Sequence, residues 1–280
     1  MSQSPITAID HLSIGVANLE AAAADYAVLL GCGPRWQGEI DDTAAAVFFA
    51  GNLWLCLVQR ASPNGLERVC FRVDSAERMS RRLDRTGIAL ERPAAVDPLA
   101  GLAVSCEESA VHCLCAPLVC GLHLAFVERR ASFEIPETSE ASAHVSGLDH
   151  LVITSSDGTA TGFLLGAQLG LDMRMDMRRP EWGARLMFFR CGDLIIEVMQ
   201  SLDAGRAAKT GAAAEEQKGD GQDEFYGLSW RVRDLAATHK RLQDSGFELS
   251  PLRKGRKPGT EVCSVRSRTA GVATLLLQPA

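Results

Sequence analysis

The stretch Ile9-Asp10-His11-Leu12-Ser13-Ile14 decides the fold, because it recurs as Leu148-Asp149-His150-Leu151-Val152-Ile153 in the second half of the chain. In both copies a Leu-Gly pair follows the His at the same distance, at Leu30-Gly31 and at Leu169-Gly170. Internal similarity of this kind indicates that one structural unit has been used twice. The sequence therefore predicts two copies of one domain.

A second pair of matching segments divides each copy again. Phe71-Arg72-Val73 is followed by Arg82-Leu83, and Trp230-Arg231-Val232 is followed at the same distance by Arg241-Leu242. Each half of the chain thus contains two openings of the same type. We therefore expect each domain to consist of two smaller modules.

Each module predicts a short apolar strand, a helix and three further strands. The opening strands are expected at 11–16, 69–73, 150–154 and 228–232. The first helix is expected at 18–30, where apolar residues follow a period near 3.6 and Gly31 can end the helix. The clearest hairpins join 45–50 to 53–58 and 185–190 to 194–199, with Gly-containing turns between them.

The domain boundaries follow from composition. The first domain is expected at 1–132, with modules at about 8–60 and 66–129, and the second at 147–280, with modules at about 147–201 and 225–279. Residues 133–146 are rich in Ser, Glu and Pro and predict a linker. Residues 203–223 consist mainly of Ala, Gly and charged residues, and they predict a flexible insertion in the second domain.

Composition narrows the class of protein. The chain is 46% hydrophobic and 23% charged, which is typical of a globular protein. Its 29 Lys and Arg residues are scattered and the net charge is −6, so we expect no nucleic-acid partner. We also expect no membrane partner, because no apolar stretch is long enough for a span. The chain has nine cysteines, an odd number, and no export signal, which favours a cytoplasmic protein with reduced thiols. We expect a monomer or a homodimer.

The four modules, the opening Asp-His-Leu motif and the closing run from Gly192 to Gln200 resemble the vicinal oxygen chelate superfamily. That superfamily includes glyoxalase I, methylmalonyl-CoA epimerase, extradiol dioxygenases and metal-free bleomycin resistance proteins. The resemblance covers nearly the whole chain. It implies an α+β fold in which four βαβββ modules pair into two glyoxalase-like domains, each with a curved mixed sheet that forms a cup.

The resemblance also implies where a divalent metal ion would bind. In this superfamily the ligands come from the opening strand and from a Glu in the closing strand of each module. The third module has both, as His150 and Glu197. The other modules offer the following pairs at these positions: His11 with Cys56, Arg68 with Ala125, and Gly227 with Leu275.

We therefore expect the active centre in the second domain, with His150 and Glu197 as metal ligands and catalytic residues. The metal could be Fe, Mn, Zn or Ni, and Glu261 or Gln278 could supply a third ligand. The alternative is a metal-free pair in which Glu197 orients His150 as an acid and base.

The first domain offers a weaker candidate site. His11, Cys56 and His123 could face its cup and bind a soft divalent ion. The alternative is a degenerate domain that is kept for packing, with His11 as a core residue. For substrate binding, Arg231 could clamp a carboxylate, and Trp182 lies in a turn suited to the mouth of the second cup.

These observations predict an enzyme in the glyoxalase, epimerase or dioxygenase range, which would be a lyase, an isomerase or a dioxygenase. Its substrate would be a small oxygenated metabolite. The rival prediction is a metal-free binding or resistance protein of the same fold, which holds a ligand in the cup without turnover.

Overall fold

The computed structural model describes residues 4–40, 42–61, 64–90, 98–99, 102, 112–129, 141, 143–202 and 222–280. The predicted insertion at 203–223, apart from its last two residues, lies outside the described residues. So does most of the predicted linker at 133–146, although the second domain's first strand begins inside that range, at Val145.

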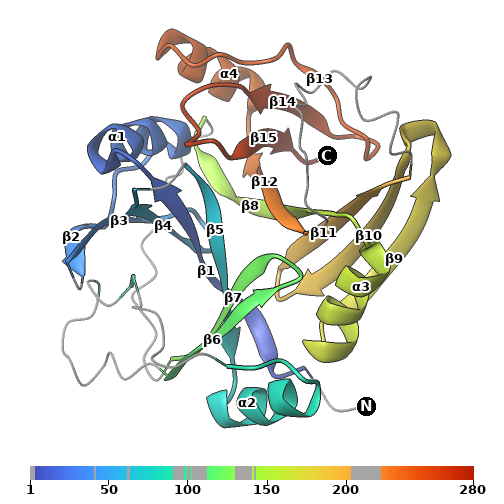
Figure 1. Cartoon of the computed structure of the whole chain (residues 1–280). Helices are drawn as coiled ribbons and strands as arrows, with labels where there is room; N and C mark the ends of the chain where they lie inside the picture. Colours follow the sequence, from blue (N-terminus) through green and yellow to red (C-terminus); the bar gives the residue numbers. More distant parts are fainter. Residues whose placement is uncertain are drawn as a thin grey trace.

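Strands and helices follow the order that the sequence predicts in three of the four modules, whereas the described part of the second module has two strands after its helix instead of three (Figure 1). The first domain contains β1 (Ile6–Val16), α1 (Leu19–Leu30), β2 (Trp36–Ile40), β3 (Thr43–Phe49), β4 (Trp54–Gln59), β5 (Gly65–Val73), α2 (Ala76–Arg85), β6 (His112–Val119) and β7 (Leu122–Glu128). The second contains β8 (Val145–Ser155), α3 (Gly158–Gly162), the π-helical η2 (Phe163–Gln168), β9 (Asp172–Arg179), the 3-10 turn η3 (Pro180–Trp182), β10 (Ala184–Cys191), β11 (Leu194–Ser201), β12 (Glu224–Val232), α4 (Leu235–Asp244), β13 (Arg253–Lys254), β14 (Glu261–Val265) and β15 (Ala273–Gln278).

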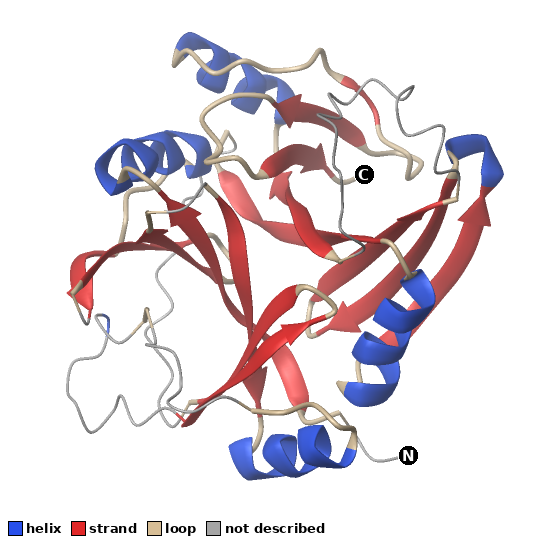
Figure 2. Cartoon of the chain, in the orientation of Figure 1, coloured by secondary structure: helices blue, strands red, loops and turns tan. Residues whose placement is uncertain are grey.

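The strands form two mixed sheets, one for each domain (Figure 2). The first has the order β2-β3-β4-β1-β5-β7-β6 and the second the order β13-β14-β15-β12-β8-β11-β10-β9. At each centre the opening strands of two modules pair antiparallel, and each pairs parallel with the closing strand of its own module. The α+β fold of two glyoxalase-like domains is confirmed. Among the described residues, none of the helices has the length and apolar character that a membrane crossing needs.

Local sequence explains the first helix. Asn18 is its N-cap, with a side chain that accepts a hydrogen bond from the backbone N–H of Ala21. Gly31 ends the helix in the left-handed region at φ 80°, and its N–H binds the carbonyl of Ala27. The helix predicted at 18–30 is therefore confirmed, with both of its signals in place.

Alternating side chains give each sheet two distinct faces. One face packs under the helices in a single hydrophobic core that includes Leu12 and Ile14 of β1 together with Leu151 and Ile153 of β8. We call the opposite face of each sheet its cup face. His11 and His150 alternate with these core residues, so both lie on cup faces.

Two arginines join the domains in matching ways. Arg82 of α2 donates hydrogen bonds to the carbonyls of Ala167 and Gln168, at the end of η2. Arg241 of α4 donates to the carbonyls of Val28 and Leu29, at the end of α1. These carbonyls have no partner within their own helices, and a cation complements the helix dipole there. The repeated Arg-Leu pair of the sequence thus binds each domain to the other.

Candidate functional site

The fold brings His150 and Glu197 together on the cup face of the second sheet. His150 lies on β8 and Glu197 on β11, which pair in parallel with Glu197 opposite Val152. The Nε2 atom of His150 is 3.6 Å from Oε2 of Glu197, and their side chains are 18% and 15% exposed. The two predicted site residues therefore converge and remain accessible.

Asp149 and Arg231 extend this pair into a chain of polar contacts. Nδ1 of His150 is 2.8 Å from Oδ2 of Asp149, and Nε of Arg231 donates to Oδ1 of the same carboxylate at 2.9 Å. The hydrogen bond with His150 is the main reason that the pKa of Asp149 is lowered; burial opposes it and Arg231 adds to it. An ionised Asp149 accepts a hydrogen bond from the N–H group at Nδ1 of His150. The other ring nitrogen, Nε2, is then directed at Glu197.

The environment of Glu197 favours its neutral form. Burial raises the pKa of this carboxyl above its usual value, and the charges of His150 and Arg256 lower it by less. Apolar neighbours explain the burial, since Phe188 and Val152 lie opposite Glu197 on the adjacent strands. A carboxyl whose pKa is shifted by burial beside a histidine is typical of functional sites.

The strand register changes the expected opening position of two modules. In the second module Cys70, and not Arg68, lies opposite His11. The sequence places Gly227 at the opening position of the fourth module, but Ser229 is the residue opposite His150, and Leu275 lies beside Ser229. Shifts in register on both sides of this pair explain the difference, because pairing between distant strands cannot be read from either strand alone. The Ser229 hydroxyl is buried and has no hydrogen-bond partner in the described part of the chain.

The two residues considered for a third ligand have other surroundings. The amide oxygen of Gln278 accepts a hydrogen bond from the N–H of Leu235, at the start of α4. Glu261 is exposed on β14. Ser229 is therefore the third polar group that the register places beside His150.

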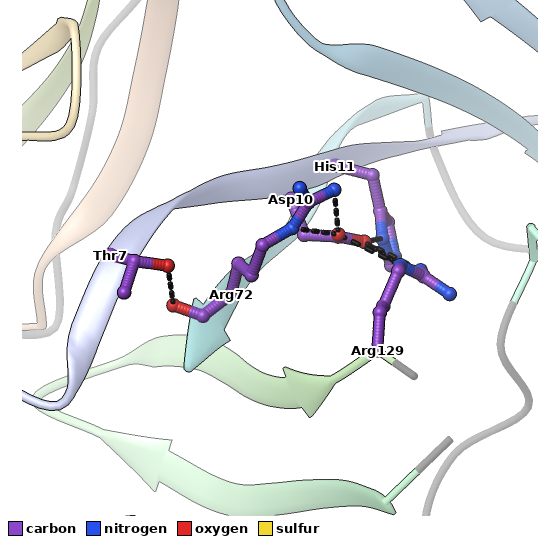
Figure 3. A network of polar contacts seen from close by, with 5 residues as sticks. All are labelled: Thr7, Asp10, His11, Arg72 and Arg129. Atoms are coloured by element: carbon purple, nitrogen blue, oxygen red, sulfur yellow. Dashed lines mark hydrogen bonds and ion pairs between the residues drawn. The ribbon is translucent and has the colours of Figure 1, made fainter. Parts of the chain in front are cut away.

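The first domain builds a different network around the same Asp-His motif (Figure 3). Asp10 contacts Nδ1 of His11 at 2.9 Å, and both Arg72 and Arg129 donate to its carboxylate. Burial raises the pKa of Asp10, but the hydrogen bonds and charges of His11 and Arg129 outweigh it, so the pKa lies far below its usual range. Asp10 and His11 are both buried. This arrangement is an internal ion-pair network.

The secondary candidate residues of the first domain do not form one group. Among the described residues, the ligand atoms of Asp10, His11 and Cys70 lie within 4.8 Å of one another, and Cys56 and His123 are outside this group. His123 is exposed. Cys56 is fully buried in a second hydrophobic cluster on the first cup face, formed by the following residues: Val47, Trp54, Cys56, Val58 and Leu99.

Trp182 lies in the 3-10 turn η3. Its ring is stacked by the guanidinium of Arg256 at 4.7 Å and approached by that of Arg179 at 5.7 Å. Arg231 holds Asp149 and also lies near the carbonyl of Asp193, and its side chain is one-third exposed. Its contacts make it a residue that positions the His150 network.

A separate cavity of about 310 Å³ lies away from these residues. It is lined by Cys120 and Gly121 of the first domain and by Ser156, Asp157, Ala160, Gln222 and Asp223 of the second. None of the residues of the His150 network lines it. The chemistry of the donor groups, and not the presence of a cavity, therefore defines the candidate site.

Comparisons with known proteins agree with this geometry. Residues 149–264 match the family described as the Glyoxalase/Bleomycin resistance protein/Dioxygenase superfamily. The match begins at Asp149 and includes His150, Glu197 and Ser229. This match assigns residues 149–264, most of the second domain, to the vicinal oxygen chelate superfamily.

Solved structures of this superfamily share the fold over nearly the whole chain. The Mn(II)-bound glyoxalase from Novosphingobium aromaticivorans is similar with a TM-score of 0.70 and 15% identity, over 98% of this chain and 83% of that one. The 2,3-dioxygenase LapB from Pseudomonas sp. KL28 is similar with a TM-score of 0.69 and 12% identity, over 100% and 94%. A mutant of 4-hydroxymandelate synthase from Streptomyces coelicolor has a TM-score of 0.69 and 14% identity, over 98% and 93%. No curated protein matches the chain in sequence.

Sequence reasoning missed three groups that the structure adds to the site. Asp149 had a usable signal, since Asp precedes His in both copies of the opening motif. Ser229 depends on the register of two strands that are distant in the sequence. Arg256 lies in a turn that the repeats do not share, so nothing in the internal similarity pointed to it.

Proposed function

We propose that the second domain is a metal-dependent enzyme centre of the vicinal oxygen chelate type, which acts on a small oxygenated metabolite. The observation that carries this proposal is the approach of His150 Nε2 to Glu197 Oε2 at 3.6 Å on an accessible cup face. A histidine and a carboxylate that converge in a half-buried site are a pair of donors that divalent transition metals bind.

The donor set fits such an ion. Asp149 occupies Nδ1 of His150, and a carboxylate on the far ring nitrogen is the usual support for a metal-binding histidine. The buried Ser229 hydroxyl, which lacks a partner among the described residues, would complete a three-residue set with His150 and Glu197. When bound, the ion would polarise adjacent oxygen atoms of the substrate and stabilise negative charge that develops on them.

Side chains of the second domain would transfer protons, orient His150 and exclude water. Glu197 would accept a proton from the substrate and return it, which is the behaviour of a general base. Asp149 and Arg231 would keep the imidazole of His150 in one orientation. Phe188 and Val152, on either side of Glu197, would limit the water around that carboxyl.

One observation favours a second candidate function, a metal-free binding protein of the same fold. Ser229 and Leu275 occupy the positions of the fourth module where the superfamily's pattern provides stronger ligands. In that case His150 and Glu197 would act as a hydrogen-bonded pair at the base of a ligand-binding cup.

Metal analysis of protein purified without chelator tests the proposal. We expect about one divalent ion per chain in the wild type, and its loss in both His150→Ala and Glu197→Gln. Added Mn²⁺, Fe²⁺ or Zn²⁺ should raise the melting temperature of the wild type, because an ion bound to the native state alone stabilises it by mass action.

His11→Ala is the matched control, because it removes the equivalent residue of the first domain. It should keep the metal and any turnover, although the loss of a buried side chain should lower its stability. Loss of the metal in His11→Ala but not in His150→Ala would place the centre in the other domain. Unchanged ligand binding after treatment with chelator, together with its loss in both second-domain variants, would support the metal-free alternative.

A further inference from the structure

Segments next to the two edge strands of the second sheet contact each other. Strands β13 and β9 are at opposite ends of the strand order, while His150 and Glu197 lie on the central strands β8 and β11. Trp182 follows β9, in η3, and Arg256 lies in the turn between β13 and β14. The guanidinium carbon of Arg256 is nevertheless 4.7 Å from the centre of the Trp182 ring. The sheet therefore curls until the segments that follow its two edge strands are in contact.

This contact region is strongly cationic. β13 and the turn that follows it carry four basic residues within five positions: Arg253, Lys254, Arg256 and Lys257. In the part of the chain that the structure describes, none of the four forms an ion pair with a carboxylate, whereas Arg179 on the same ring has Glu181 at 4.0 Å. Two guanidinium groups against one indole repel each other unless an anion lies near them.

Arg256 also acts on the site itself. Burial is the main cause of the raised pKa of Glu197, and the positive charge of Arg256 is one of the two effects that oppose it. The charge of Arg256 therefore reaches the carboxyl that a substrate would contact. Stacking on Trp182 fixes the plane of the guanidinium, so less freedom is lost when its N–H groups bind a ligand.

We propose that Arg256, positioned on Trp182 across the second cup, binds an anionic group of the substrate, which is therefore a small oxygenated molecule that carries a carboxylate or a phosphate. A planar guanidinium binds either group through two parallel hydrogen bonds. The identity of the substrate rests on the proposed function, but binding of the anion requires no metal ion.

Trp fluorescence of the metal-free wild type, prepared with chelator, gives a direct test because Arg256 contacts an indole. The probes are lactate, glycerol 3-phosphate and the neutral propane-1,2-diol. We expect at least one of the two anions to change the fluorescence and the diol to have no effect over the same concentrations. Trp182→Phe should abolish the signal. Comparison of lactate with glycerol 3-phosphate shows whether the site prefers a carboxylate or a phosphate.

Three substitutions separate a specific site from general attraction. Arg256→Gln should weaken anion binding about tenfold, as expected for the loss of a charge-assisted hydrogen bond. Arg256→Lys should retain part of the affinity. Arg266→Gln removes the same charge from an exposed position outside the turn and should bind like the wild type.

Equal weakening in Arg256→Gln and Arg266→Gln, equal binding of the diol, or no response to either anion would overturn the proposal. Failure of the metal proposal is distinguishable from these results. It would appear as metal content that does not depend on His150 or Glu197, while the fluorescence titrations of metal-free protein would be unchanged.

Discussion

The two cup faces begin from the same Asp-His motif and end in opposite environments. At three matching positions of the closing strands, the first domain has Trp54, Cys56 and Val58, and the second has Ile195, Glu197 and Met199. The first three are buried in a cluster with Leu99, whereas the second three are only partly buried. A hydrophobic cluster fills one cup face, and the other keeps a carboxylate within reach of ligands.

The Asp-His pairs differ for a related reason. Asp10 binds two arginines, and the side chain of Arg129 is only 5% exposed. In the second domain the position that strand pairing makes equivalent to Arg129 is Pro279, which has no charge. Among the arginines of the described residues, Arg231 is the one that binds Asp149, and the side chain of Asp149 stays about one-third exposed. The comparison teaches that one motif becomes structural when its charge is fully enclosed and remains available for chemistry when it is not.

The largest expected effect tests this difference in enclosure. Asp10→Ala removes a buried carboxylate that contacts His11 and the buried Arg129, and it should lower the free energy of unfolding by about 4 kcal/mol. The matched Asp149→Ala breaks a partly exposed pair and should cost about 1 kcal/mol or less, while it disturbs the orientation of His150. Urea denaturation of both variants measures the difference. Equal losses of stability would show that the two networks have the same role.

A smaller loss of stability is expected when a carboxyl like that of Glu197 is placed at the equivalent position of the first domain, Cys56. Cys56→Glu introduces an unpaired carboxyl into the cluster of Trp54 and Leu99 and should destabilise the protein by about 3 kcal/mol. Cys56→Val, which keeps an apolar side chain of similar size, should change stability by less than about 1.5 kcal/mol. Thermal and urea unfolding provide the measurement. A stable Cys56→Glu protein that gains a metal ion would contradict the description of this cup face as packed.

The smallest effect concerns the pH dependence of the open site. The pKa of Glu197 is raised in the folded protein, so the native state binds its proton more tightly than the unfolded chain. Stability is therefore lost as pH rises through the raised pKa, because the carboxylate then ionises in apolar surroundings. In metal-free protein, Glu197→Gln should raise the melting temperature by about 2 °C at pH 8 and have little effect at pH 4.

The exposed Glu261→Gln is the control for this measurement, because it changes a carboxyl on the same sheet without removing a buried one. It should show no difference between the two pH values. Melting curves of Glu197→Gln that follow the wild type from pH 4 to pH 8 would show that the environment of Glu197 does not favour its neutral form.

The sequence by itself determined the modules, because they depend on short-range regularities. Strand alternation, the 3.6 period of α1, its Asn18 cap and the terminal Gly31 all act within a few residues, and each is present in the structure. The pairing of His150 with Glu197 could also be predicted from the sequence, because the repeated opening motif and the closing run mark adjacent strands of one module.

Only the tertiary structure decided which cup face is open and what surrounds each histidine. Ser229 lies beside His150 because two modules pair in a register with several shifts, which neither strand encodes alone. Leu99 and Arg129 enclose the first site, and Arg256 reaches Trp182, through segments that are distant in the sequence. Burial and charge pairing are properties of such long-range contacts, so the difference between a structural and an accessible Asp-His pair arises only when the chain is folded.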